Sequence, residues 1–312
     1  MIPVDDEASV SLVRQRVREL GAGLDPQLVE RAALVASELA HNQLRHGRLG
    51  EIDVTRMGSG LEVRAIDHGA GIERLSQAFS GEPHPDSPGL GMGLAGVRRL
   101  SQGLDVLTRR LESQELTARF GEFVPRWRDV LLYARPHPDE RTSGDDAAVF
   151  RTATGHVVVV ADGLGHGEKA REASRLAVRT VRDHVDEAPL ELMERCDAAL
   201  RRTRGAALAI GRIRGDELEI AIAGNIRGQL LRPRDSSRLP SVSRIVGGGR
   251  GQRFRASTHR MVGAVLLLAS DGLQEACLPT RRDPTGWQLG LLARLVETGL
   301  RETDDATILL VH

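Results

Sequence analysis

Two long apolar segments of this 312-residue chain run directly into an aspartate. HVVVVAD at 156–162 is followed by Gly163, and AVLLLAS at 264–270 is followed by Asp271. A short apolar run that ends at a turn signal is typical of a strand buried on both faces. A carboxylate at the end of such a strand is costly unless it faces water, a partner or a cation. The C-terminal part is therefore expected to form sheets with an acidic edge.

The N-terminal part shows a different pattern, in which two amphipathic helices precede paired strands. Alternating apolar and polar residues on either side of a Gly-Ser-Gly turn predict a β-hairpin. The expected segments are helices at 9–20 and 26–46, hairpin strands at 51–57 and 61–67, a loop at 68–90, a helix at 92–101, and strands near 104–110 and 114–120.

A chain of this length usually divides into more than one hydrophobic core, so two domains are expected, 1–125 and 126–312. The mixture of sheets and helices in each predicts an α+β fold. In the second domain the expected segments are strands at 130–134, 156–162, 206–213, 218–224, 228–232, 264–270 and 306–312, helices at 168–184, 189–203 and 285–300, a turn-rich segment at 135–146, and a loose loop at 236–253.

Charge and composition exclude several classes of function. The chain has 43 basic and 43 acidic residues, so it lacks the basic excess of a nucleic-acid-binding or membrane-binding surface. Its two cysteines form no disulfide framework or metal-binding cluster, which suits a reducing compartment. The N-terminal residues do not resemble a signal peptide, and no apolar run approaches the ~20 residues of a membrane-spanning helix. We expect a cytoplasmic protein with no nucleic-acid partner and no membrane association.

The helix at 26–46 carries an unusual column of polar side chains. Glu38, Asn42 and His46 lie four residues apart, so a helix places them on one face. Taken alone, this column could be an ordinary solvated face. Two glycine clusters farther along the chain favour a function for it.

The first cluster, Asp67-His68-Gly69-Ala70-Gly71, follows a strand, and the second, containing Gly89, Gly91 and Gly93, opens a helix. Glycines before a helix let backbone N–H groups approach a phosphate, and the positive end of the helix dipole favours the anion. An aspartate at a strand end can accept a hydrogen bond from the amine of adenine. Each motif alone is common, but their combination with the helical column predicts a nucleotide site.

The helical column, the strand with DxGxG and the helix with GxGxG together resemble the Bergerat ATP-binding fold of histidine kinases, gyrase and serine-kinase relatives. GLGMGLAGVRRLSQGLDVLTR resembles the RsbT-like switch kinases and related anti-sigma-factor kinases. The resemblance implies an N-terminal Bergerat-type α/β sandwich that binds ATP with Mg²⁺. The implied roles are general base for Glu38, Mg²⁺ ligand for Asn42 and a phosphate contact for His46.

The same resemblance assigns the remaining residues of the nucleotide site. It implies that Asp67 holds adenine, with Thr117 in support, and that Gly69 and Gly71 let the ring approach the backbone. It implies that Gly89, Gly91 and Gly93 cradle the triphosphate.

Acidic residues also mark the ends of several strands in the second domain. Asp145, Asp162, Asp271 and Asp304 each sit where a strand meets a turn, and Asp146 and Asp305 adjoin two of them. Carboxylates that converge in this way can hold two cations, which activate water for attack on a phosphoester. Oxygen ligands favour Mg²⁺ or Mn²⁺ over zinc.

The segments ADGLGHG, SDGL and DDATILLV occur in an order similar to that of the PPM-type serine/threonine phosphatases of the SpoIIE and RsbX group. The resemblance implies a PPM-type α-β-β-α sandwich with two Mn²⁺ or Mg²⁺ ions. Its implied ligands are Asp145, Asp162, the carbonyl of Gly163, Asp271 and Asp304, with Asp146 and Asp305 as alternatives to their neighbours. His166 is either a loop residue or a general acid.

Together the two resemblances predict a bifunctional bacterial partner-switching regulator. One domain would phosphorylate serine or threonine on STAS-domain antagonist or scaffold proteins, and the other would remove that phosphate. Two alternatives stay open for the N-terminal domain. It could bind ATP and regulate the phosphatase without transferring phosphate, or it could act as an anti-sigma factor that contacts a sigma-factor regulator or the sigma subunit.

Overall fold

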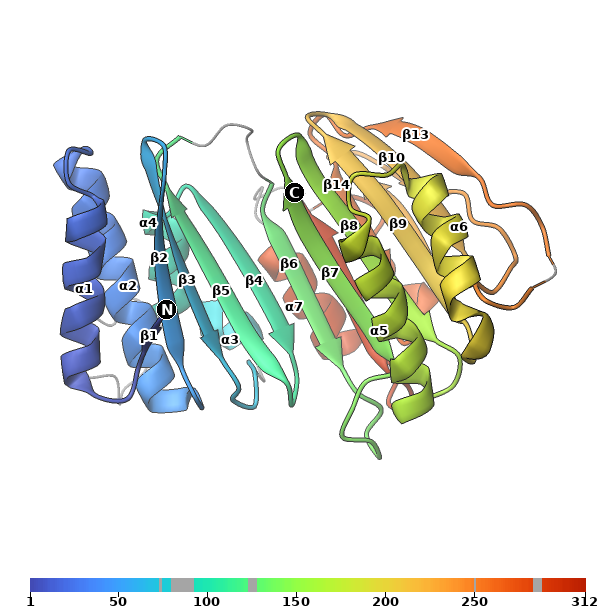
Figure 1. The fold of residues 1–312 in the computed structure, drawn as a ribbon, viewed down its shortest axis with the longest axis horizontal. Coiled ribbons are helices and arrows are strands. Elements are labelled where there is room, and N and C mark those ends of the chain that lie inside the picture. Colours follow the sequence, from blue (N-terminus) through green and yellow to red (C-terminus); the bar gives the residue numbers. More distant parts are fainter. Residues whose placement is uncertain (73–74, 80–92, 123–127, 250, 283–287) are drawn as a thin grey trace. The chain divides into compact units, whose positions relative to one another are not determined.

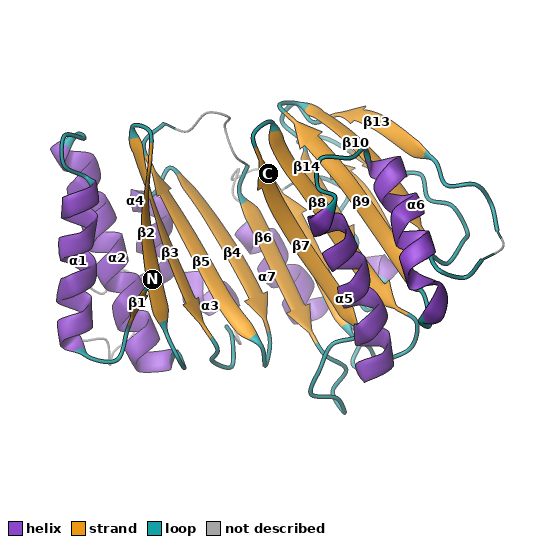
Figure 2. Cartoon of the chain, viewed as in Figure 1, coloured by secondary structure: helices purple, strands orange, loops and turns teal. Residues whose placement is uncertain are grey.

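The computed structural model describes residues 1–72, 75–79, 93–122, 128–249, 251–282 and 288–312 (Figure 1). The chain forms two compact units, Met1–Val130 and Leu131–His312. The domain boundary expected at residues 125 and 126 lies outside the described residues. Both units contain helices and strands, as Figure 2 shows. Within the described ranges, none of the helices combines the length and the apolarity needed to cross a membrane.

The first unit packs helices on an antiparallel sheet with the strand order β1-β2-β3-β5-β4. The expected hairpin is confirmed as β2 and β3, in which Met57 pairs with Gly60. The elements are β1 (Ile2–Pro3), α1 (Glu7–Leu20), α2 (Pro26–His46), β2 (Glu51–Met57), β3 (Gly60–Asp67), α3 (Leu75–Phe79), α4 (Gly93–Leu100), β4 (Gly103–Arg109) and β5 (Ser113–Phe120).

The long helices of this unit begin at capping residues. The side chain of Asp6 accepts a hydrogen bond from the Ser9 N–H, which satisfies one of the free donors at the start of α1. Asp25 accepts from Gln27 N–H, and Pro26 occupies the first turn of α2, where its missing donor is not needed. These caps fix the point at which α2 starts and therefore the phase of its polar column.

The second unit contains two sheets with helices on their outer sides. One sheet has the order β6-β15-β14-β11-β12 and the other β13-β10-β9-β8-β7. The elements are β6 (Val130–Arg135), β7 (Asp145–Thr152), β8 (Gly155–Gly163), α5 (Glu168–Asp183), α6 (Pro189–Ala199), the 3₁₀ turn Leu200–Arg202, β9 (Ala206–Arg214), β10 (Glu217–Ala223), β11 (Arg227–Leu231), β12 (Ser236–Arg238), β13 (Ala256–Arg260), β14 (Val265–Ala269), the 3₁₀ turn Glu275–Cys277, α7 (Leu289–Thr298) and β15 (Ala306–Val311).

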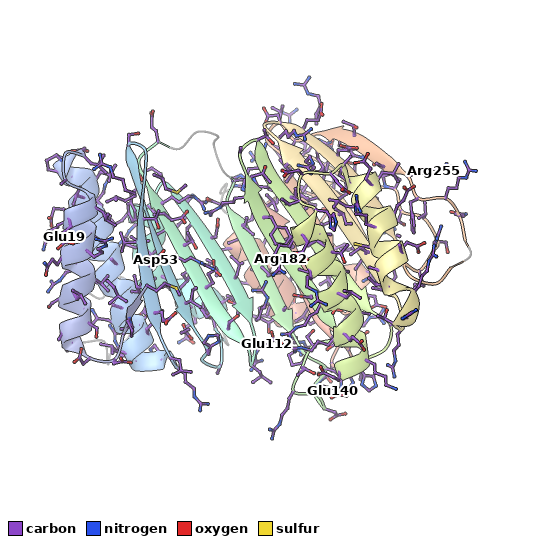
Figure 3. All side chains as sticks on the ribbon, viewed as in Figure 1. Glu19, Asp53, Glu112, Glu140, Arg182 and Arg255 are labelled. Carbon is purple, nitrogen blue, oxygen red and sulfur yellow. The ribbon has the colours of Figure 1, made fainter. Side chains whose placement is uncertain are left out.

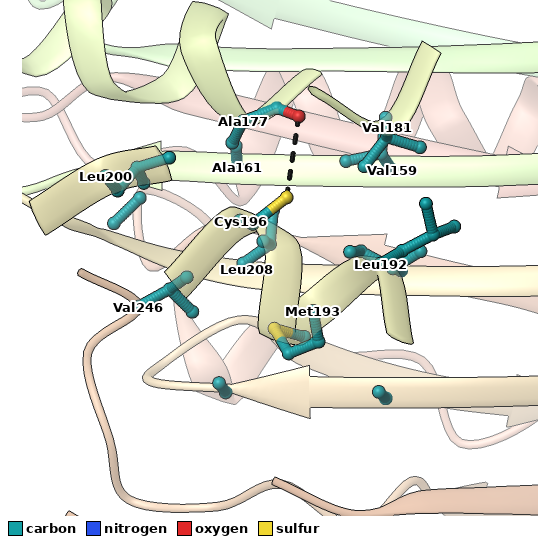
Figure 4. Close-up of a cluster of buried hydrophobic side chains, with 14 of the residues drawn as sticks. Val159, Ala161, Ala177, Val181, Leu192, Met193, Cys196, Leu200, Leu208 and Val246 are labelled. Carbon is teal, nitrogen blue, oxygen red and sulfur yellow. Dashed lines mark hydrogen bonds between the residues drawn. The ribbon is translucent and has the colours of Figure 1, made fainter. Parts of the chain in front are cut away.

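Figure 1 shows α5 and α6 over one sheet of this unit and α7 on the side of the other sheet. The layer beneath α5 and α6 is a continuous apolar core (Figure 4). In it, Leu192, Met193 and Cys196 of α6 are fully buried against strands β8 and β9. The Cys196 thiol donates to the Ala177 carbonyl of α5 at 3.7 Å, which satisfies a weak donor that would otherwise lack a partner.

Three strands of this unit were not predicted from the sequence. β7 begins within the turn-rich segment, and β12 lies in the stretch expected to be a loose loop. The third is β13, at the edge of its sheet. The same stretch also contributes isolated bridges from Val242 and Val246, so 236–253 is not a loose loop. These segments gain their regularity from pairing with neighbouring strands rather than from their own apolar pattern.

Candidate functional site

Two adjacent strands place the first pair of carboxylates together in the second unit. Asp145 at the start of β7 is the antiparallel partner of Asp162 near the end of β8. Residues that pair directly across a ladder point to the same face, so both carboxylates lie on one side of the sheet. Asp146 points to the other side, and its Oδ1 accepts a hydrogen bond from Ala147 N–H at 2.8 Å.

The other sheet of this unit contributes a second group of carboxylates. Asp271 follows β14 and Asp304 precedes β15, and these strands are antiparallel neighbours. Ser270 joins their ends, because its N–H donates to the Thr307 carbonyl and its hydroxyl accepts from the Thr307 N–H. Asn225 Nδ2 donates to Asp271 Oδ2 at 2.6 Å, which restricts the orientation of that carboxylate.

The electrostatics show that the two groups of carboxylates act on one another. Burial and the charges of its neighbours together raise the pKa of Asp162 to about 9. Burial is the largest cause, followed by the charge of Asp145 and then by those of Asp271, Asp304 and Asp305. The five carboxylates therefore form a single cluster, which we call the acidic cluster.

The pKa of Asp145 is raised for the same reasons. It is raised to about 8, mainly by burial and also by the charges of Asp305 and Asp271, while the nearby hydroxyls of Ser270 and Thr307 oppose the increase. The pKa of Asp304 is raised first by burial and then by the charge of Asp271. Holding these groups ionised together is unfavourable without a neutralising charge.

The acidic cluster fits the requirements of a hard divalent cation. The Oδ2 atoms of Asp145 and Asp305 are buried with no hydrogen-bond donor in the described part of the chain. All the side-chain atoms that the acidic cluster offers as metal ligands are carboxylate oxygens, which suit Mg²⁺ and Mn²⁺. Among the residues that the structure describes, no three His, Cys, Asp or Glu side chains lie close enough to hold a metal ion by themselves. The carboxylates repel one another in the absence of a cation, and a bound cation would draw their side chains closer together.

The adjacent Asp304 and Asp305 have different environments. Asp305 is 3% exposed, and its Oδ1 accepts a hydrogen bond from the His137 N–H at 2.7 Å. Asp304 is partly exposed, and its side chain is therefore the more accessible of the two. Asp304 remains the predicted ligand, and Asp305 ties the loop after β6 to the start of β15.

Two glycines beside the acidic cluster are required by close backbone contacts. A Cβ atom on Gly163 would lie 2.1 Å from the carbonyl oxygen of Ala170 in α5. A Cβ on Gly272 would lie 1.9 Å from the carbonyl oxygen of Asp305. Neither distance is possible for a side chain, so each Asp-Gly pair needs its glycine for packing. The predicted metal contact of the Gly163 carbonyl remains a prediction.

A pair of histidines lies next to the acidic cluster. The rings of His137 and His166 stack with centroids 5.1 Å apart. Burial raises the pKa of Asp305, and the electrostatic effect of the two imidazoles opposes this increase. His166 is exposed, and its Nδ1 lies 3.0 Å from Oε1 of Glu140, which Figure 3 labels on the loop between β6 and β7. His137 and Glu140 were not predicted from the sequence, because nothing in their spacing indicates that this loop returns to His166.

In the first unit, the polar column of α2 runs from the core to the surface. Glu38 is 6% exposed, Asn42 is partly exposed and His46 is exposed. The neighbouring Gln43 donates from Nε2 to the carbonyls of Glu51 and Ile66, at 3.1 and 2.8 Å. These two bonds hold the last turns of α2 against the ends of β2 and β3, near Asp67.

The DxGxG loop begins at Asp67. Its Oδ1 accepts a hydrogen bond from Gly69 N–H at 2.8 Å, and burial raises the pKa of this carboxyl. A Cβ on Gly69 would lie 3.0 Å from the His46 carbonyl, so the loop passes close to the end of α2. Gly71 has a φ of +79°, which favours glycine.

The second glycine cluster lies mostly outside the described residues. Gly93, with a φ of +52°, is the first residue of α4. Gly89 and Gly91 belong to the part that the structure does not describe. Their predicted phosphate contacts remain predictions.

The predicted support of Asp67 by Thr117 is wrong. Thr117 pairs with Arg64, three residues before Asp67, so the two side chains point to opposite faces of the sheet. The residue paired with Asp67 is Gln114. A shift of an odd number of residues along a strand reverses the face, and the sequence alone does not fix that register.

Each of the two units matches a known protein family. Residues 2–120 match the family model described as the histidine kinase-like ATPase domain. Residues 152–311, more than half of the chain, match the model of stage II sporulation protein E (SpoIIE). The chain belongs to the SpoIIE family. The mixed α+β class, with an ATPase-like domain followed by a PPM-type phosphatase fold, is thereby confirmed.

Individual relatives support this family. The phosphoserine phosphatase RsbX of Bacillus subtilis (strain 168) is 29% identical over 147 residues, which are 46% of this chain and 74% of RsbX. A solved chain from work on the bacterial stressosome is 25% identical, with a TM-score of 0.52, and covers 59% of this chain and 98% of its own length. RsbX in complex with magnesium has a TM-score of 0.52 at 23% identity, covers 59% of this chain and 96% of its own, and shows the shared fold.

Proposed function

We propose that the second unit is a metal-dependent protein phosphatase that acts on phosphoserine and phosphothreonine. The observation that carries this proposal is the acidic cluster, in which burial and four other carboxylates raise the pKa of Asp162 to about 9. A site that is so unfavourable for its own charges is suited to binding cations. The relationship to the phosphoserine phosphatase RsbX gives the reaction class.

Asp145, Asp162, Asp271, Asp304 and the Gly163 carbonyl would hold two Mg²⁺ or Mn²⁺ ions. When bound, such ions supply Lewis-acid catalysis and lower the pKa of water to near neutrality. The chain's own residues orient the ligands. Asn225 directs Asp271 through its amide N–H, and Gly163 lets the end of β8 lie directly against α5.

We propose that the first unit binds Mg²⁺ and ATP and transfers the γ-phosphate to serine or threonine. Phosphoryl transfer depends mainly on positioning and charge neutralisation, so few catalytic side chains are needed. Asn42 would hold Mg²⁺, Glu38 would accept the proton of the attacking hydroxyl, and Asp67 would accept a hydrogen bond from the adenine amine. His46 and the glycines of both clusters would line the phosphates and the ring.

The protein substrates would be STAS-domain antagonist or scaffold proteins in a bacterial partner-switching system. A phosphoserine carries nearly two negative charges, which disrupt an apolar interface through repulsion and desolvation. A chain that adds and removes such a group would set the fraction of partner that is free to bind. The match to a stressosome chain supports this setting.

The burial of Glu38 favours a second candidate, in which the first unit binds ATP and regulates the phosphatase without transferring phosphate. A carboxylate that is 6% exposed reaches a protein hydroxyl only if the surrounding residues move. Glu38→Gln separates the two candidates. If Glu38 is the base, the unchanged protein labels a STAS protein from γ-labelled ATP and Glu38→Gln does not. If the first unit is purely regulatory, neither the unchanged protein nor Glu38→Gln labels the STAS protein.

The phosphatase is tested by measuring phosphate release from a phosphorylated STAS protein in the presence of Mn²⁺. We expect Asp145→Asn to abolish release, while Asp146→Asn, which changes the adjacent side chain on the other face, leaves most of it. Equal activity of Asp145→Asn and the unchanged protein would contradict the proposal.

A further inference from the structure

Three polar side chains form a row across the sheet of the first unit. Asp67 at the end of β3 pairs with Gln114 of β5, and Gln114 pairs on its other side with Thr108 of β4. Directly paired residues share a face of the sheet. The buried apolar residues Val63 and Val106 lie on that same face, nearer the middle of their strands. The row is therefore the polar end of a face that is otherwise core.

The row contains two polar groups that have no hydrogen-bond partner among the residues that the structure describes. Gln114 is 5% exposed, and its Nε2 has no acceptor among the described residues. Thr108 is fully buried, and its Oγ1 likewise has no partner within the described ranges. Leaving a buried polar group without a hydrogen bond is unfavourable, so two adjacent ones point to a ligand that is hydrogen-bonded here.

The row lies beside the loop proposed to hold the nucleotide. A Cβ on Gly71 would lie 3.2 Å from Cγ2 of Thr108, so the DxGxG loop passes over that end of the row. Asp67 at the other end uses Oδ1 to accept the Gly69 N–H. In the described part of the chain, its Oδ2 receives no hydrogen bond. A base held by Asp67 would therefore have Gln114 as its next polar neighbour.

We propose that Gln114 determines base specificity by donating a hydrogen bond from Nε2 to N1 of adenine. Adenine presents an amine donor beside the N1 acceptor, which matches a carboxylate acceptor beside an amide donor. Guanine and hypoxanthine present the opposite order, a carbonyl beside an N1–H. The inference rests on the proposed binding of ATP to the first unit.

The test compares ATP with 1-deaza-ATP, in which C–H replaces N1, by isothermal titration of the full chain in Mg²⁺. We expect the unchanged protein to bind ATP roughly tenfold more tightly, the ratio that one hydrogen bond supplies. In Gln114→Leu, ATP and 1-deaza-ATP should bind equally. Gln229→Leu is the matched control, because Gln229 is also 5% exposed and one of its amide atoms has no partner among the described residues, but it lies on β11 of the other unit.

Thermal unfolding without nucleotide shows whether the substitution damages the fold. Gln114→Leu removes an unsatisfied amide, so its transition should be equal to or higher than that of the unchanged protein. A tenfold ratio that persists in Gln114→Leu overturns the role of Gln114 while leaving ATP binding intact. A chain that binds neither nucleotide overturns the proposed ATP site itself.

Discussion

Replacement of Asp162 by asparagine should stabilise the metal-free protein while removing its response to metal. The side chain is nearly isosteric, and it lacks the charge that burial and four neighbouring carboxylates disfavour. Asp162 is therefore proposed to lower the stability of the metal-free fold while serving as a metal ligand. The native residue destabilises the fold unless a cation is present.

The size of the effect follows from the pKa. Below about pH 4, Asp162 is protonated in both the folded and the unfolded chain, so it contributes no difference. Between there and its folded pKa of about 9, the unfolded chain loses the proton that the metal-free fold retains, so stability falls as pH rises. At about 1.4 kcal/mol per pH unit, the ceiling at pH 7.5 is about 5 kcal/mol. Because Asp162 is partly exposed, we expect on the order of 2 kcal/mol.

The assay is thermal unfolding in EDTA at pH 5.5 and pH 7.5, followed in the transition of the second unit. Asp162→Asn should unfold roughly 4–8 °C higher than the unchanged protein at pH 7.5, and the gap should narrow at pH 5.5. Mn²⁺ should raise the transition of the unchanged protein and leave that of the variant in place. Asp183→Asn, on an exposed site at the end of α5, is the control. A variant that is less stable than the unchanged protein in EDTA at pH 7.5 would refute this electrostatic argument.

Three further predictions concern packing and burial. Asp105→Asn should lower the free energy of unfolding in urea by about 3–5 kcal/mol, because it leaves the buried guanidinium of Arg119 without its bidentate carboxylate partner at 2.9 and 3.0 Å. Arg119 also donates to Asp129 at 2.8 Å, and an unchanged midpoint would show that Asp129 alone suffices. Gly272→Ala should reduce soluble, folded protein, since its Cβ would lie 1.9 Å from a carbonyl oxygen; a normal thermal transition argues against that contact. Burial raises the pKa of the Cys196 thiol to about 12. A thiol reagent at pH 8 should therefore label Cys277 rapidly and Cys196 only after unfolding, as measured by peptide mapping. Rapid labelling of Cys196 in the folded protein would contradict its burial.

The sequence predicted the elements that have a strong local pattern. The hairpin β2–β3, the capped helix α2 and the buried strand β8 each follow from periodicity, turn residues or an apolar run. β7 was missed because it opens with two aspartates and alternates weakly, and its pairing with β8 decides its structure. Strands that depend on a partner leave little local signal.

The residues of the candidate sites also differ in whether a local pattern or strand pairing reveals them. Asp-Gly after an apolar strand is a local signal, and it located Asp162 and Asp271. The choice of Asp145 as the partner of Asp162, the opposite face of Thr117 and the position of Gln114 all depend on strand register. Register is fixed by tertiary pairing. The sequence named Asp145 only through the family resemblance and left Asp146 open as its alternative, and the face of Thr117 and the place of Gln114 came from the structure alone.

The central claim, that the acidic cluster holds divalent cations, is tested most directly by counting bound Mn²⁺ with electron paramagnetic resonance of the free ion. The account predicts two ions per chain that are lost or strongly weakened in Asp162→Asn and retained in Asp183→Asn. Failure of the unchanged protein to take up Mn²⁺, or equal uptake by Asp162→Asn, would contradict it.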